Sequence, residues 1–130
     1  MPRERQLPQN GPRVLLLEND AGVRRSLHML LRTHGFDVRS HASVESMLAD
    51  PSLGEAQFLV SDYRLDRATG IEALRALRAA GWKRRAVLIT ASPVIDLAET
   101  ARAAGFDALL EKPFEPHALI GLLTDDADPG

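Results

Sequence analysis

Polar side chains follow four short apolar runs of the chain, and together they could bind a cation and a phosphoryl group. Glu18 and Asn19 follow the first run, Asp62 the second, Thr90 the third and Lys112 the fourth. Oxygen ligands without His or Cys suit a hard cation, with Mg²⁺ first among them. A lysine and a hydroxyl beside that cation suit the negative oxygens of a phosphoryl group. The Asp carboxylate is then either a metal ligand or a nucleophile toward phosphorus.

Each of these residues also has an ordinary structural explanation. An Asp after a strand is often a turn former or a helix cap. Glu18 alone could be a solvated strand end, Thr90 a hydroxyl bonded to the backbone, and Lys112 a surface lysine before a proline. Their joint occurrence at four strand ends favours chemistry, because the carboxyl ends of parallel strands meet at one edge of a sheet. We expect Glu18, Asp62 and Lys112 to lie together there.

The apolar runs themselves predict buried strands. The run Phe58–Ser61 is short, apolar and bounded by polar residues, which suits a strand buried on both faces. Glycines at 35, 81 and 105 are each followed by Phe or Trp, a pattern typical of a left-handed helix cap with a hydrophobic residue folding back. Three helices that end alike, each before a candidate strand, indicate a repeated βα unit and a parallel sheet covered on both faces.

The expected elements follow in chain order. Strands are predicted at 13–18, 37–41, 58–61, 86–89 and 108–111, the second being polar and therefore near an edge of the sheet. Helices are predicted at 21–34 with Asp20 as N-cap, at 44–49, at 70–80, from Pro93 to 104, and at 115–123, with a loop over 62–69. We expect one domain over 13–124, a disordered tail or linker at 1–12 and a disordered tail at 125–130.

Composition excludes several classes of function. The 130 residues carry a net charge of −2, so no broad cationic field would bind nucleic acid or a membrane surface. The basic run from Trp82 to Arg85 is interpreted as a solvated loop. The chain contains no cysteine, no bilayer-length apolar run and no apolar core of a signal peptide. We therefore expect a cytoplasmic protein, and we interpret its four histidines, which lack ligand spacing, as surface or helix-end residues.

Taken together, these motifs resemble the receiver domains of two-component response regulators. The resemblance covers about 13–123 and rests on VLLLEND with VRRSL, LVSDYRL with TGIEALRALR, VLITAS, and LLEKPF. It implies a flavodoxin-like, doubly wound α/β fold with a five-stranded parallel sheet of order 2-1-3-4-5. In that order the switch point lies between the first and third strands, where Glu18 and Asp62 lie.

The resemblance also implies roles for the site residues. Asp62 would accept the phosphoryl group from a phosphohistidine on a sensor histidine kinase or a histidine phosphotransfer protein. Mg²⁺ would bridge Asp62, the backbone carbonyl of Arg64, and Glu18 and Asn19, which stand where the family has its acidic pair. Lys112 would contact a phosphoryl oxygen and Thr90 would swing in to bond another. Residues 64 and 92, here Arg64 and Ser92, influence how long the phosphoryl group survives, and the last two helices would form a homodimer interface.

Three departures from the family pattern are visible in the sequence. Asn19 stands at the direct metal-ligand position, where the family has a second acidic residue, so we expect weak Mg²⁺ binding and slow phosphorylation unless Asp20 turns inward. Leu109 stands where many members have a switching Tyr or Phe. The loop 65–70 lacks the usual proline-glycine element.

Three functional hypotheses remain open from the sequence. The first is a phosphoaccepting receiver domain, either part of a hybrid sensor kinase or of a response regulator, and not an enzyme in the ordinary sense. The second is a degenerate receiver that acts only as a protein-interaction module, with Asn19 marking the lost metal chemistry. The third, a small hydrolase with Asp62 as nucleophile, is poorer because no general acid and no substrate-binding insertion is evident.

Overall fold

The computed structural model describes residues 11–91 and 94–124. Segments 1–10 and 125–130, which hold most of the two predicted tails, lie outside the described residues, as do Ser92 and Pro93. Among the described residues, no helix combines the length and the apolar character needed to cross a membrane.

A five-stranded parallel sheet forms the centre of the molecule. Its strands are β1 (Arg13–Leu17), β2 (Asp37–His41), β3 (Phe58–Asp62), β6 (Arg85–Thr90) and β7 (Ala108–Glu111), arranged in the order β2-β1-β3-β6-β7. Counted among these five long strands alone, this is the predicted order 2-1-3-4-5, with the polar second strand at an edge. The predicted fold class is therefore confirmed.

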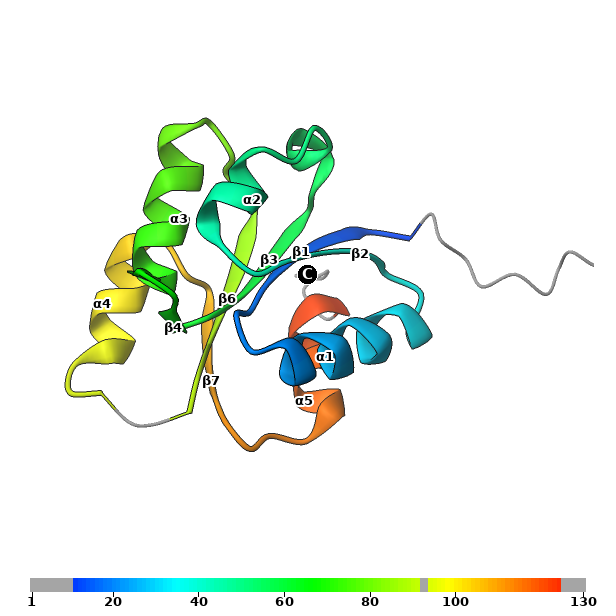
Figure 1. The fold of residues 1–130 in the computed structure, drawn as a ribbon. Coiled ribbons are helices and arrows are strands. Elements are labelled where there is room, and N and C mark those ends of the chain that lie inside the picture. The colour runs from blue at the N-terminus through cyan, green and yellow to red at the C-terminus, as the bar shows by residue number, and fades with distance from the viewer. Residues whose placement is uncertain (1–10, 92–93, 125–130) are drawn as a thin grey trace, which may run out of the picture.

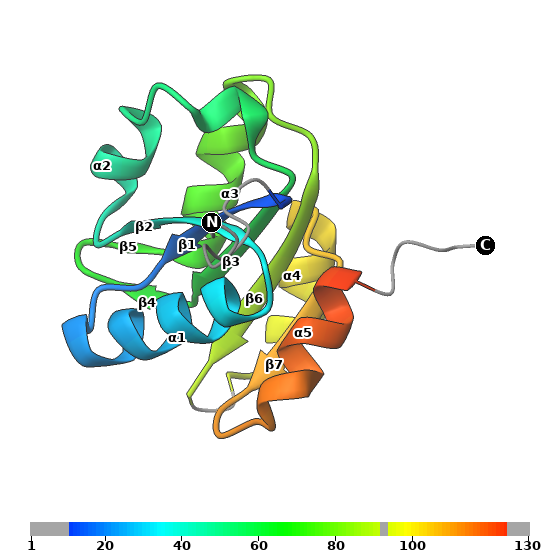
Figure 2. The same ribbon diagram turned by 90° about the vertical axis from the view of Figure 1, so that its right-hand side faces the viewer.

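Helices cover both faces of this sheet (Figure 1). One face carries α1 (Ala21–Thr33) and α5 (Pro116–Thr124), and the other carries α2 (Val44–Leu48), α3 (Gly70–Ala79) and α4 (Leu97–Ala104). The view in Figure 2 shows α5 running beside β7 in the opposite direction, back toward the amino-terminal edge of the sheet.

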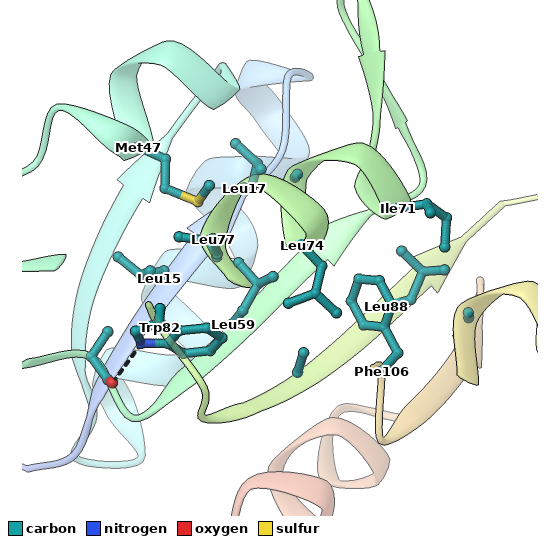
Figure 3. Close-up of a cluster of buried hydrophobic side chains, with 14 of the residues drawn as sticks. Leu15, Leu17, Met47, Leu59, Ile71, Leu74, Leu77, Trp82, Leu88 and Phe106 are labelled. Atoms are coloured by element: carbon teal, nitrogen blue, oxygen red, sulfur yellow. Dashed lines mark hydrogen bonds between the residues drawn. The ribbon is translucent and has the colours of Figure 1, made fainter. Parts of the chain in front are cut away.

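Successive residues of each strand point alternately into two separate apolar cores, as expected for strands buried on both faces. Leu15 and Leu17 of β1 pack with Leu59, Leu74 and other residues of the core under α2, α3 and α4 (Figure 3). The intervening Val14 and Leu16 pack into the second core under α1 and α5, with the buried residues Leu27, Leu31, Val60, Leu119 and Leu123.

The three predicted glycine caps are confirmed. Gly35, Gly81 and Gly105 have φ of 91°, 96° and 114°, the left-handed region that glycine enters without strain. The residue after each donates its backbone N–H to a carbonyl of the last helical turn: Phe36 to Leu31, Trp82 to Leu77 and Phe106 to Ala101. All three aromatic side chains are buried, so each cap also fixes where the next strand begins.

Two of the predicted boundaries are wrong. The fourth helix begins at Leu97 and not at Pro93, because Asp96 adopts a left-handed φ of 61° that no α-helix continues through. The predicted loop 62–69 contains a small antiparallel hairpin of β4 (Arg64–Leu65) and β5 (Ala68–Thr69). A short 3₁₀ helix, Leu53–Glu55, was also not predicted.

Candidate functional site

Three side chains from distant parts of the chain meet at the carboxyl edge of the sheet. The Lys112 ammonium lies 3.4 Å from Glu18 Oε1 and 3.6 Å from Asp62 Oδ2. Glu18 follows β1, Asp62 ends β3 and Lys112 follows β7, so the strand order places one cation between two carboxylates. The sequence analysis expected this meeting from the strand ends alone.

Glu18 is held from several sides. Only 2% of the residue is exposed, and burial is the largest of the effects that raise the pKa of its carboxyl; the nearby Asp62 carboxylate also raises it. The Asp20 backbone N–H, which donates to Glu18 Oε2 at 3.1 Å, and the Lys112 ammonium oppose that rise. Backbone contacts fix the residue further, since its N–H donates to the His41 carbonyl at 3.1 Å.

Asp62 stands at the end of a closely packed strand. Its side chain is 12% exposed, which leaves the carboxylate reachable from outside. The backbone beside it is crowded: a Cβ added to Gly70 would lie 2.6 Å from the Asp62 carbonyl oxygen and 2.6 Å from Leu88 Cδ1. The Tyr63 N–H donates to the Ile89 carbonyl at 2.7 Å, which continues the β3–β6 ladder past Asp62. A side chain at position 70 would therefore push directly on the backbone that carries the carboxylate.

Thr90 lies at the same edge. It is buried, at 3% exposure, and its carbonyl accepts from the Lys112 N–H at 2.8 Å, so the ends of β6 and β7 are joined next to the lysine. Leu109 of β7 is partly buried against the core under α3 and α4, and lines a hollow of about 350 Å³ together with Thr90 and Val94. The family position usually held by a switching aromatic is thus filled here by a packed aliphatic side chain.

Asn19 and its neighbour Asp20, the residues discussed for the second metal-ligand position, both lie at the surface. Asn19 is exposed. Asp20 is exposed too, and its Oδ1 accepts from the Val23 N–H at 3.0 Å, the N-cap bond of α1 that the sequence predicted. The inward turn of Asp20 that would compensate for Asn19 is not adopted in this structure.

The backbone of Arg64 is free to turn its carbonyl away from its hairpin partner. The Gly70 N–H donates to the Tyr63 carbonyl at 2.7 Å, so 63 and 70 occupy a hydrogen-bonded position of the ladder with one of its two bonds formed. Hydrogen-bonded and non-hydrogen-bonded pairs alternate in an antiparallel ladder, so the next pair, Arg64 and Thr69, directs its carbonyls outward. Ser92 lies outside the described residues.

The donor set fits a hard divalent cation, with a deficit of charge. Glu18 and Asp62 supply two carboxylates, Asn19 next to Glu18 in the sequence carries an amide oxygen, and such oxygens suit Mg²⁺. Within the parts of the chain that the structure describes, however, no cluster of three or more His, Cys, Asp or Glu side chains is arranged to hold a metal. Any cation here would share its two carboxylates with Lys112.

Three supporting residues were not assigned from the sequence. Arg24 Nη1 donates to the Glu18 carbonyl at 2.8 Å, the His41 carbonyl accepts from Glu18, and Gly70 gives room to Asp62. The sequence did contain a signal for Arg24. In a helix that begins at Ala21, residue 24 lies in the first turn and therefore close to the end of the preceding strand, where Glu18 lies. The contacts of His41 and Gly70 link segments 23 and 8 residues away from their partners, and no local pattern marks them.

Comparison with known proteins agrees with this fold. The model of the response regulator receiver domain family matches residues 14–124. The chain belongs to the response regulator receiver domain family.

Several relatives illustrate the range of this similarity. The transcriptional regulatory protein FixJ of Azorhizobium caulinodans is 32% identical over 114 residues, which are 88% of this chain and 54% of FixJ. The cell cycle transcriptional regulator CtrA of Caulobacter vibrioides is 28% identical over 83% of this chain and 47% of CtrA. The chain thus spans about half the length of the curated relatives it matches.

Solved structures match over nearly their whole length. A response regulator receiver protein from Burkholderia phymatum is 32% identical, with a TM-score of 0.75, over 88% of this chain and 94% of the other. The chemotaxis protein CheY4 of Vibrio cholerae gives a TM-score of 0.81 over 88% of this chain and 97% of the other. At 22% identity the second likeness supports the fold alone.

Proposed function

We propose that this receiver domain accepts a phosphoryl group on Asp62 from a phosphohistidine of a partner protein. One observation carries the proposal: the Lys112 ammonium lies within 3.6 Å of both the Asp62 and the Glu18 carboxylates, each delivered by a different strand. A single ammonium beside a reachable carboxylate can neutralise the oxygens of a group that arrives there. The 12% exposure of the Asp62 side chain gives a partner access to it.

The transfer exchanges one bond for another. An Asp62 carboxylate oxygen attacks phosphorus, a P–O bond forms, and the P–N bond to the partner's imidazole breaks, with the electron pair staying on the nitrogen. Lys112 moves from the carboxylates to an equatorial phosphoryl oxygen, and the Thr90 hydroxyl donates to another. A phosphoryl transfer of this kind needs positioning and charge neutralisation more than covalent help from the protein.

Glu18, Asn19, Asp62 and the Arg64 carbonyl would hold Mg²⁺, which when bound supplies positive charge to the oxygens of the transferred group. The chain's own residues keep that set in place: Arg24 binds the Glu18 carbonyl, and the hairpin after Asp62 turns the Arg64 carbonyl outward. Asn19 contributes no charge, so Mg²⁺ binding is weak.

A direct experiment tests the acceptor. The protein is incubated with Mg²⁺ and phosphoramidate, and its intact mass is followed. The expected result is one added phosphoryl group, absent from Asp62→Asn and present in Asp66→Asn, a matched control in the exposed turn four residues on. A phosphoryl group that still appears in Asp62→Asn would refute the assignment of the acceptor.

A second candidate function is a degenerate receiver that only binds a partner. The observation that favours it is the charge deficit: Asn19 is neutral, and the Asp20 carboxylate is engaged as the cap of α1. Under this alternative, neither phosphoramidate nor a phosphorylated histidine kinase or phosphotransfer protein adds a phosphoryl group, while Asn19→Asp restores uptake.

The wider setting of the domain follows from the same proposal. Its partners are sensor histidine kinases or histidine phosphotransfer proteins, and the domain is part of a response regulator or of a hybrid kinase. A homodimer through α4 and α5, a cytoplasmic location and the absence of nucleic-acid binding by this domain stay predictions.

A further inference from the structure

A cationic hollow lies at the amino-terminal edge of the sheet, opposite Asp62. Its volume is about 410 Å³, and we call it the basic hollow; it is lined by Gln57, Phe58, Arg78, Lys83, Arg84, Arg85 and Asp107. Phe58 and Arg85 begin β3 and β6, and Asp107 directly precedes β7. The feature therefore belongs to the edge that the phosphorylation chemistry leaves unused.

The charge in the basic hollow is strongly unbalanced. Four of its lining residues are basic and one is acidic, on a chain whose net charge is −2. Arg85 Nη1 lies 3.8 Å from Asp107 Oδ1, and these two residues form an ion pair. Lys83 and Arg84 are exposed, and among residues 11–91 and 94–124 no carboxylate pairs with either.

Part of the basic hollow is rigid. Arg78 donates to the carbonyls of Trp82, Arg84 and Gly105 at 3.0–3.1 Å, and its guanidinium stacks 5.3 Å from the centre of the Trp82 ring. The loop that carries Lys83 and Arg84 is thus tied to α3 and to the end of α4. The backbone that carries the two exposed cations is fixed, so binding an anion does not require that loop to be ordered.

The chemistry of the basic hollow favours acidic peptide over nucleic acid. Single-stranded nucleic acid is held by a cationic groove together with exposed aromatic rings on which bases stack. Trp82, the chain's only tryptophan, is buried with its indole N–H bonded to the Ala56 carbonyl at 2.9 Å, so it offers no stacking face. Carboxylates need only the charge and the donors that Lys83 and Arg84 provide.

We propose that the stretch 125–130, which follows α5 and carries Asp125, Asp126 and Asp128, docks on the basic hollow of its own chain. Three carboxylates within four residues complement the excess cations. The effective concentration of a tethered segment is high, so individually weak ion pairs are sufficient to hold it.

The course of α5 brings this acidic stretch to the right place. The helix runs antiparallel to β7 and ends at Thr124 near the amino-terminal edge of the sheet (Figure 2). A second hollow, lined by Leu122 and Gly121 of α5, shares Arg85 and Asp107 with the basic hollow, so the two are neighbours. Six residues reach at most about 20 Å when extended, enough to follow that surface. Docking would fix the direction in which the chain leaves the domain, on the edge away from Asp62.

Paramagnetic relaxation tests the docking. The chain has no cysteine, so Ala127→Cys gives a single site for a nitroxide label. Amide relaxation of residues 83–85 is measured at 50 mM and 500 mM NaCl, and compared with the same labelled protein carrying Asp125→Asn, Asp126→Asn and Asp128→Asn. We expect at least twofold stronger relaxation enhancement in the charged protein at low salt, and loss of the difference at high salt, where screening is nearly complete beyond about 4 Å.

A control of equal charge isolates the acidic stretch. Glu45→Gln, Asp66→Asn and Glu99→Gln neutralise three exposed carboxylates elsewhere, and should leave the enhancement unchanged. Lys83→Gln with Arg84→Gln should abolish it. Equal enhancement in the charged and neutralised proteins overturns the proposal. So does a result in which only an added glutamate-rich peptide or single-stranded DNA shifts the amides of residues 83–85, because the basic hollow would then serve another molecule.

Discussion

Replacing Asn19 by Asp should convert a weak cation site into a stronger one. The substitution adds one negative charge next to Glu18, on the side of the site that faces solvent. Two unit charges 4 Å apart interact by about 1 kcal/mol in water, and a divalent ion doubles this to about 2 kcal/mol. Because Asn19 is exposed, the dielectric constant of water applies to this interaction. Screening at physiological salt reduces the attraction between the new carboxylate and Mg²⁺ from about 2 kcal/mol to about 1 kcal/mol. The dissociation constant for Mg²⁺ should therefore fall about fivefold.

The same charge should have an opposite effect without metal. A third carboxylate near Glu18 and Asp62 adds repulsion that Lys112 alone cannot offset, so the free energy of unfolding should fall by on the order of 1 kcal/mol. Saturating Mg²⁺ should restore this loss, because binding to the folded state stabilises it. The two effects share one cause and must appear together.

Calorimetric titration with Mg²⁺ and urea unfolding with and without Mg²⁺ measure both effects. Gln57→Glu is a control that adds the same charge at the opposite end of β3, and should leave Mg²⁺ affinity unchanged. Asp20→Asn removes a charge but keeps the capping oxygen, and should also change little. Equal Mg²⁺ affinity in wild type and Asn19→Asp would refute the electrostatic reasoning.

Three further predictions concern stability. Gly70→Ala should lower the free energy of unfolding in urea by about 1–3 kcal/mol, because its Cβ meets backbone at 2.6 Å, whereas Gly54→Ala, with open space around it, should be nearly neutral. Burial raises the pKa of Asp50, but hydrogen bonds from Ser52 and His41 outweigh it and lower the pKa from 3.8 to about 2. The lowered pKa stabilises the folded protein by about 2 kcal/mol above pH 4, and this stabilisation is lost as the pH falls toward 2. The free energy of unfolding of Asp50→Asn should therefore lack this pH-dependent part. An Asp50→Asn protein with the same pH dependence of unfolding as the wild type would contradict the prediction. Arg67 has a left-handed φ of 71°, so Arg67→Gly should raise the denaturation midpoint by the equivalent of up to about 1 kcal/mol, and a lower midpoint would argue against strain in that turn.

Those features of the fold that depend on local patterns could be predicted from the sequence. The three glycine caps each combine a residue without Cβ and a following aromatic, and both parts of the pattern lie next to each other in the chain. The repeated βα units predict a parallel sheet, and the strand order came from the resemblance to receiver domains. The meeting of Glu18, Asp62 and Lys112 needed only that order, because parallel strands end at a common edge.

The errors arose where tertiary contacts or unusual backbone angles decide the local structure. Asp96 begins α4 from a left-handed conformation and Arg67 turns the β4–β5 hairpin, so neither left-handed position carries the glycine that would have marked it. His41 was expected to be a surface residue. Its Nε2 lies 2.9 Å from Asp50 Oδ2 and its Nδ1 bonds to Ser46, leaving the side chain 12% exposed. Nothing in the spacing of 41, 46 and 50 distinguishes this network from three unrelated polar residues.

The position of the α1 cap decides how much negative charge lies at the proposed phosphorylation site. The Asp20 side chain accepts from the Val23 N–H and so caps the start of α1, while the Asp20 backbone N–H donates to the Glu18 carboxylate. Turning its carboxylate inward would lose a cap bond that stabilises a helix by about 1 kcal/mol, and would compete with Glu18 for Lys112. Two carboxylates and one ammonium are therefore the stable arrangement of this edge. In such a receiver, Lys112 neutralises the oxygens of the incoming phosphoryl group more than a tightly bound cation does. Phosphorylation should be slow because the charge of a bound Mg²⁺ is largely missing.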